Sequence, residues 1–267
     1  MRWALAGAAL GGAAVLLACA PAAWLADALA QASEQRVLLA DARGTLWNGS
    51  AVVVLTGGAS SRSASALPGR LTWTLGLDGS ALGLRAQQAC CINGELRLRV
   101  QPGWRRLRIE LLAPPAGQVA AAVGQWPASW LVGLGAPWNT LQPTGTLQLS
   151  SPGLVLEQLQ GRWSLQGRVE LEMGNIASRV TSLDVLGSYR LSLVGDAAQG
   201  QAPRVQLSTT SGALLLTGDG QWQGEGAASK LHFNGAASAA PGSEAALGGL
   251  LNIIGRRQGA QSVITIG

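Results

Sequence analysis

The chain has 267 residues, of which 48% are hydrophobic and only 12% charged, and 37 are glycine. Soluble domains are typically about 25% charged and about 7% glycine, so this composition excludes both a disordered chain and a charge-rich coiled coil. The net charge is +5 at pH 7, and the length allows one domain or two small ones.

An apolar segment begins almost at the N-terminus. Trp3 to Ala26 contains no charged residue and is long enough for about 36 Å of helix, against a hydrocarbon core of about 30 Å. Arg2 precedes this segment and Asp27 follows it, which favours export of everything after residue 26. We therefore predict a cytoplasmic tip and transmembrane anchor over residues 1–26, a juxtamembrane linker over 27–36 and an exported domain over 37–267.

Two alternatives to a retained anchor are open. Leu16-Leu17-Ala18-Cys19 resembles a lipoprotein signal that ends at a lipidated Cys19, and Ala18-Cys19-Ala20 loosely matches the small-residue site of a cleavable signal peptide. The apolar run continues beyond both sites to Ala26, and this continuation favours an anchor that stays attached.

From Val37 onward, apolar and polar residues alternate. The pattern occupies residues 71–77, 94–100, 107–111, 145–149, 169–173 and 189–193, and the intervals between these segments are rich in Gly, Pro, Asn and Asp. Period-two alternation with such intervals is typical of half-buried antiparallel strands joined by hairpins. We expect a mostly β domain, either an open sheet or a sandwich.

Two stretches depart from the alternation and predict short helices. One is the Ala-rich segment 117–134, where Pro127 is placed to start a helix, and the other is the amphipathic segment from Ser243 to Arg257. Residues 262–266 then predict a final strand.

Three cysteines are present, and two of them are neighbours. Cys19 lies within the apolar N-terminal segment, whereas Cys90 and Cys91 lie in the exported part, where an oxidising compartment favours disulfides. Neighbouring Cα atoms are closer than most disulfides prefer, so a bond between them and a pair of buried thiols both remain open, as does an intermolecular bond. Ile92-Asn93-Gly94 follows directly, so we expect the pair at a turn and without a metal.

The chain shows none of the familiar catalytic or cofactor-binding motifs. It contains no GxSxG, Walker or GxGxxG sequence, and its only histidine, His232, lies between Leu231 and Phe233 and is expected to point outward from a strand. No zinc-binding CxxC is present. We therefore expect a protein that is not an enzyme and that needs no cofactor.

Arginines concentrate in one predicted hairpin. They are expected on its outer face, where they form either a solvated surface or a contact for anionic lipid headgroups: Arg97, Arg99, Arg105, Arg106 and Arg108. An exported domain meets no DNA, so we expect membrane lipids and proteins as partners and no nucleic acid.

Several short motifs occur in a characteristic order along the chain. A Gly-x-Leu-Trp-x-Gly-x-Ala motif spans residues 44–51, followed by Leu-Pro-Gly-Arg-Leu-Thr-Trp over 67–73, Gly-Arg-Trp over 161–163, Leu-Gly-Ser-Tyr over 186–189 and a C-terminal segment that ends in Gly-Arg-Arg at 255–257. Taken in order, these motifs resemble protein N of the bacterial type II secretion system. The motif residues with expected structural roles are Gly44, Leu46, Trp47, Gly49, Gly69, Trp73, Gly161, Trp163, Gly187, Tyr189 and Gly255. Trp47, between two glycines, is expected to be a large buried anchor.

The resemblance implies an accessory single-pass protein of the bacterial inner membrane with its C-terminal domain in the periplasm. Such a protein would take part in the export of folded periplasmic proteins through contacts with other secretion components. The resemblance brings no catalytic residues. A second hypothesis for the alternating, Trp-rich chain is a membrane-anchored lipid-binding or lipid-transfer protein with an open β-groove. An apolar groove that is open to solvent in the structure would favour this hypothesis.

Overall fold

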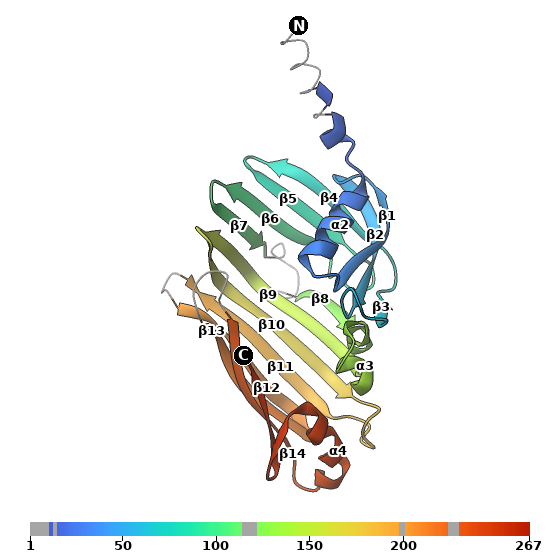
Figure 1. Cartoon of the computed structure of the whole chain (residues 1–267), viewed down its shortest axis with the longest axis vertical. Coiled ribbons are helices and arrows are strands. Elements are labelled where there is room, and N and C mark those ends of the chain that lie inside the picture. The colour runs from blue at the N-terminus through green and yellow to red at the C-terminus, as the bar shows by residue number, and fades with distance from the viewer. Residues whose placement is uncertain (1–10, 13–14, 114–121, 198–200, 224–229) are drawn as a thin grey trace.

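The fold is one large antiparallel sheet, seen in a computed structural model that describes residues 11–12, 15–113, 122–197, 201–223 and 230–267 (Figure 1). The first half of the described chain contains α2 (Ala22–Ala32), β1 (Val37–Gly44), β2 (Asn48–Thr56), β3 (Ala64–Ala66), β4 (Leu71–Asp78), β5 (Ala81–Gln87), β6 (Leu96–Gly103), β7 (Arg106–Leu111), β8 (Ala122–Pro127), the 3-10 helix η1 (Ala128–Leu134) and α3 (Trp138–Leu141).

Longer strands dominate the second half. It contains β9 (Thr144–Leu159), β10 (Arg162–Ala177), β11 (Gly187–Asp196), β12 (Gln201–Gly212), β13 (Leu214–Gln223), β14 (Lys230–Ala239), α4 (Glu244–Ile254), β15 (Arg256–Gln258) and β16 (Gln261–Ile266). The helix expected within residues 243–257 and the final strand are confirmed. In the Ala-rich segment, a helix does follow Pro127 as expected, but residues 122–127 form a strand because they pair with β9.

Every pairing between neighbouring strands is antiparallel, and the strand order is β1-β2-β4-β5-β6-β7-β9-β10-β11-β12-β13-β14-β16-β15, with β3 paired to β2 and β8 to β9. The order follows the chain closely because short turns join most successive strands. The expectation of a mostly β domain is confirmed, and of the two architectures considered the open sheet is the correct one.

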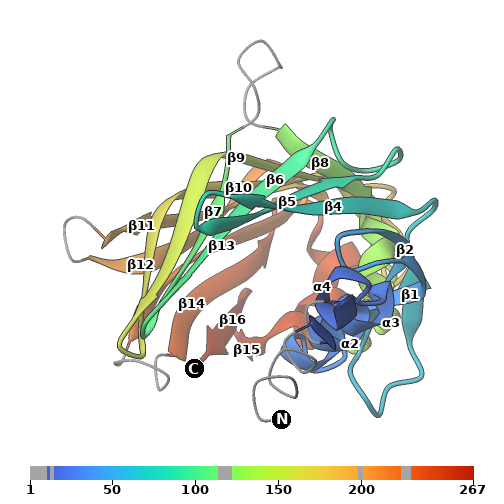
Figure 2. The ribbon, with the colours of Figure 1, turned by 90° about the horizontal axis from the view of Figure 1, so that it is seen from above.

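The sheet curls strongly, and α2, α3 and α4 lie on its concave side (Figure 2). Helix α2 contacts β1 and β2 at one end of the strand order, whereas α4 contacts β14, β15 and β16 at the other. Each end has its own buried cluster. The N-terminal core cluster consists of Ala22, Leu39, Ala51, Val53, Leu67, Trp73 and Cys91, and the C-terminal core cluster of Leu186, Tyr189, Leu214, Ala237, Leu247, Leu250 and Leu251.

Between the two clusters, the concave face carries rows of half-buried apolar side chains. Pairing across β5, β6, β7 and β9 aligns Leu84, Leu98, Leu111 and Leu154. A bulge in β9 between Leu149 and Leu154 shifts the alternation of apolar and polar side chains along the strand. Because of this shift, both halves of β9 direct apolar side chains to the same face. At the bulge the buried Ser151 hydroxyl donates to the Arg168 carbonyl at 2.7 Å and accepts from the Gly153 N–H.

The N-terminal segment differs from the predicted uninterrupted helix. Residues 1–10 and 13–14, which include most of the apolar segment before residue 15, lie outside the described residues. In the described part, helical residues 15–18 end before Ala20 and Pro21, and Ala20 and Ala22 are buried against the domain. No helix within the described part of the chain is long and apolar enough to cross a membrane. Residues 27–36, expected as a linker, form the second half of α2 and the turn that follows it.

Candidate functional site

Motif residues from the β1–β2 turn and from β4 pack together beside α2. We call this cluster the N-terminal joint; it consists of Gly44, Leu46, Gly49 and Trp73. Trp73 on β4 is only 3% exposed, and its indole N–H donates to the Leu46 carbonyl at 3.0 Å. Gly49 lies directly beneath the ring, where a Cβ atom would sit 2.4 Å from Trp73 Cζ2. Gly44 has a φ of +88°, and a Cβ there would lie 2.5 Å from the Asn48 carbonyl oxygen. The spacing of the motif thus reflects close packing of the β1–β2 turn against one tryptophan.

Trp47 is not the buried anchor that the sequence predicts. Its side chain is half-buried, and its indole N–H donates to the Leu17 carbonyl at 2.8 Å. The neighbouring Leu46 N–H donates to the Ala20 carbonyl at 2.7 Å. Trp47 therefore binds the N-terminal segment to the domain. Trp73, and not Trp47, fills the core, because the space above Gly49 is occupied by the Trp73 ring.

An arginine in the second motif ties the joint together. The Arg70 guanidinium contacts the Asp41 carboxylate at 2.7 Å, donates to the Asp41 carbonyl at 2.6 Å and bonds the Ser50 hydroxyl at 3.2 Å. Arg43 contacts the same carboxylate at 2.8 Å. Hydrogen bonds from Arg70, then from Arg43, hold the pKa of Asp41 below its usual value. No sequence pattern points to Asp41, whereas Arg70 belongs to the Leu-Pro-Gly-Arg-Leu-Thr-Trp motif.

This arrangement makes the stability of the joint depend on pH. A carboxyl group whose pKa is lowered by folding contributes stability that is present above its unfolded pKa and is lost as the pH falls through the folded value. We therefore expect Asp41→Asn to lower the melting temperature at neutral pH, with the difference from wild type vanishing in acid. Melting curves from about pH 7 to about pH 3 measure this.

The exposed Asp219 on β13 supplies the matched control for that measurement. Asp219→Asn should leave the melting temperature close to wild type throughout the same range. An Asp41→Asn variant as stable as wild type at neutral pH would show that the arginines hold the joint without the carboxylate.

Cys90 and Cys91 are joined by a disulfide in the connection between β5 and β6. Their sulfur atoms lie 2.05 Å apart. Cys91 is buried in the N-terminal core cluster, and its carbonyl accepts a hydrogen bond from Gln125 N–H at 2.8 Å. A Cβ at Gly124 would lie 2.3 Å from that carbonyl oxygen, so the cysteine pair packs tightly on β8. Cys19 is a free, exposed cysteine, and the described residues contain no group of three or more His, Cys, Asp or Glu placed to hold a metal ion.

The arginines of the β6–β7 hairpin are mostly occupied within the protein. The register places Arg97, Arg99, Arg106 and Arg108 on the face opposite α2, and Arg97 and Arg99 line a shallow hollow of about 520 Å³ there. Arg99 contacts Asp78 at 2.5 Å, Arg106 and Arg108 contact Glu157 at 2.7 and 3.7 Å, and Arg97 donates to the Ala113 carbonyl. In the part of the chain that the structure describes, Arg105 is the one arginine of the five whose guanidinium makes no hydrogen bond or ion pair.

The remaining motif residues lie at two other places. Gly69 (φ +78°) precedes β4 and Gly161 (φ +85°) turns β9 into β10, where Trp163 is 44% exposed. Gly187, Tyr189 and Gly255 belong to the C-terminal end. There the Tyr189 hydroxyl donates to the Leu214 carbonyl at 3.1 Å, and burial raises its pKa.

These positions show what the motifs do physically. The motifs at residues 44–51 and 67–73 form the N-terminal joint. The Leu-Gly-Ser-Tyr motif and the C-terminal motif belong to the region where α4 packs on the sheet. Of these motifs, only Gly-Arg-Trp ends at an exposed aromatic side chain. His232 lies on a strand, β14, as predicted, and is half-buried next to the buried Phe233.

Comparison with known proteins identifies the family of the chain. The family model for the type II secretion system (T2SS), protein N, matches residues 35–265. Searches of curated proteins and of solved structures gave no match. The family match includes both core clusters from β1 onward and all of the ordered motifs, so the chain belongs to the type II secretion system protein N family.

Proposed function

We propose that the protein is an accessory inner-membrane component of the type II secretion system, which takes part in the export of folded periplasmic proteins through protein–protein contacts. The observation that carries this proposal is the family match over residues 35–265. Membership of the family implies other type II secretion components as partners. The proposed role is structural rather than enzymatic, in keeping with arginines and carboxylates that serve as ion pairs between strands.

We further propose that residues 1–26 attach the chain to the inner membrane, with the sheet in the periplasm. The charges on either side of the apolar segment, Arg2 and Asp27, support this orientation. The described end of the segment is consistent with it, because the side chains of Val15, Leu16 and Leu17 are all more than half exposed. These aliphatic side chains continue the uncharged run of the apolar segment, which the proposed attachment would place in the bilayer.

Secretion itself tests the proposed function. In a host with an active type II system, deletion of the gene for this chain should lower the fraction of a type II substrate found outside the cell, with the substrate accumulating in the periplasm. The full chain supplied in trans should restore secretion. The measurement is the extracellular share of that substrate by immunoblot.

A substrate exported by an unrelated route provides the control, and its level should not change. Unaltered type II secretion in the deletion strain, with the chain absent by immunoblot, would contradict the proposed function.

A second candidate function is the binding of acyl chains on the concave face. It is favoured by the row formed by Leu84, Leu98, Leu111 and Leu154, which lies between the two helix-covered ends of the sheet and is only half-buried. A curved sheet lined with leucine offers apolar surface without hydrogen-bonding groups, which suits a lipid tail. Normal secretion in the deletion strain would favour this candidate over the first.

A further inference from the structure

One edge of the sheet collects large apolar side chains in its turns. We define the tip edge as the turns β1–β2 (residues 45–47), β4–β5 (79–80), β6–β7 (104–105) and β9–β10 (160–161). At or beside the last three, the exposed large apolar side chains are Leu77 (77%), Trp104 (94%), Leu159 (52%) and Trp163 (44%). A single exposed leucine or tryptophan is ordinary, but four on neighbouring turns mark a contact surface.

The turns of the tip edge are held together rather than scattered. Gln160 N–H donates to the Arg105 carbonyl at 3.0 Å, which joins the β6–β7 and β9–β10 turns directly. Arg106 on β7 lies opposite Leu159 on β9, and its guanidinium forms an ion pair with Glu157, which is also on β9. Trp104, Leu159 and Trp163 are therefore presented by one connected pair of hairpins.

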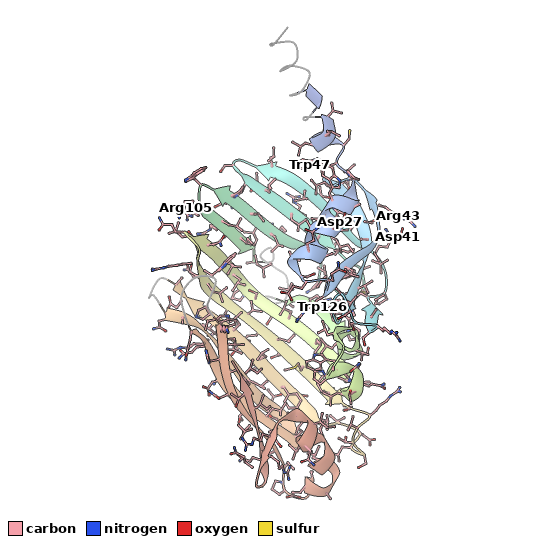
Figure 3. The ribbon with its side chains drawn as sticks, viewed as in Figure 1. Asp27, Asp41, Arg43, Trp47, Arg105 and Trp126 are labelled. Carbon is pink, nitrogen blue, oxygen red and sulfur yellow. A yellow bond between two sulfur atoms is a disulfide. The ribbon has the colours of Figure 1, made fainter. Side chains whose placement is uncertain are left out.

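The N-terminal segment leaves the domain from this same edge. Its last described contacts are with the β1–β2 turn, where Trp47 bonds the Leu17 carbonyl and Leu46 bonds the Ala20 carbonyl. Residues 15–18 extend beyond the upper end of the sheet in Figure 1, where the β4–β5 hairpin also ends. Trp47 and Arg105 both lie in the upper part of Figure 3, Trp47 near the N-terminal segment and Arg105 at the left margin of the sheet. A membrane that holds the N-terminal segment would therefore face the tip edge.

The charges at the tip edge suit an anionic surface. Arg105 is exposed and has no side-chain partner in the described structure, while the nearby carboxylates of Asp78 and Glu157 are already paired with Arg99 and Arg106. Tryptophan prefers the boundary between headgroups and acyl chains, and basic residues are attracted to anionic headgroups there. Indole rings beside a free guanidinium are the side chains expected of such a contact.

We propose that the tip edge rests on the anionic lipid bilayer from which the N-terminal segment emerges, with Trp104 and Trp163 at the level of the headgroups and Arg105 contacting lipid phosphates. The inference rests on the proposed membrane attachment of residues 1–26. It adds a second membrane contact, made by the sheet itself, which fixes the orientation of the sheet relative to the membrane.

Quenching of tryptophan fluorescence by brominated phospholipid tests the inference on the full chain. The wild-type protein is reconstituted in vesicles of phosphatidylglycerol and phosphatidylcholine, with and without bromine on the acyl chains. We expect the double variant Trp104→Phe, Trp163→Phe to lose part of the quenched emission, because both indoles sit within reach of the lipid. In the variant Arg105→Glu, quenching should fall in the anionic vesicles but not in vesicles of phosphatidylcholine alone.

Trp138→Phe, in α3 near the opposite edge, is the matched control and should leave the quenched emission unchanged. All substituted tip residues are exposed, so unchanged melting temperatures should show that the variants fold. Equal quenched emission in wild type and the double variant would overturn the membrane contact of the tip edge while leaving the attachment intact. Failure of the wild type to float with vesicles would overturn the proposed attachment and the tip contact together.

Discussion

Replacing Trp73 with alanine is expected to lower the free energy of unfolding by about 3–5 kcal/mol, the range for removal of a buried tryptophan. The side chain is 3% exposed, fills the N-terminal core cluster and donates a hydrogen bond to the Leu46 carbonyl. Its loss leaves a cavity over Gly49, which has no side chain to fill it. Chemical denaturation, followed by far-ultraviolet circular dichroism, measures the change.

Two other tryptophans serve as controls for this variant. Trp104→Ala should change the free energy of unfolding by no more than about 0.5 kcal/mol, because that side chain is almost fully exposed. Trp47→Ala should fall between the two, since it removes a half-buried ring and the bond to Leu17. If Trp47→Ala proved more destabilising than Trp73→Ala, the assignment of the buried anchor would be wrong.

Replacing Leu247 with alanine should cost about 2–5 kcal/mol, because α4 buries this side chain completely. Leu247, Leu250 and Leu251 form the inner face of α4 and pack over Tyr189 and Leu214 in the C-terminal core cluster. The same denaturation experiment measures the loss.

Ile253 lies on the same helix and is 46% exposed, so Ile253→Ala is the matched control, with an expected change of about 0.5 kcal/mol. The two core clusters share no residue, so Trp73→Ala and Leu247→Ala combined should add to within about 0.5 kcal/mol. A large departure from additivity would show that the two ends of the sheet are energetically coupled.

The strands were largely predictable, since alternation of apolar and polar residues reports directly on a sheet with one buried face. The choice between an open sheet and a sandwich was not, because it depends on pairing and curvature that alternation does not encode. The strand at residues 122–127 is not predicted by its sequence: it pairs with β9, and the lack of a side chain at Gly124 permits the close approach to the Cys91 carbonyl.

The candidate site shows a similar limit at the level of single residues. Gly44 and Gly49 were recognised as structural, but which tryptophan they accommodate depends on β4 crossing beside β2, and this favoured Trp73 over Trp47. The pairing of Asp41 with Arg70 joins residues 29 apart, which no local pattern reveals. The break at Pro21 was visible as a proline in the apolar segment, but only burial of Ala20 and Ala22 shows that the domain takes up this part of the chain.

The two outermost strands determine how such a sheet avoids joining to copies of itself. An exposed strand with free backbone groups is a template for aggregation unless it is short, charged or irregular. At one margin, β1 is interrupted by a bulge around Asp41, whose φ is +50°, and the Arg43 and Arg70 side chains gather there. At the other, β15 has only three residues, two of them arginine. Both margins thus discourage edge-to-edge polymerisation, so neighbouring copies held at one membrane surface would not readily join their sheets.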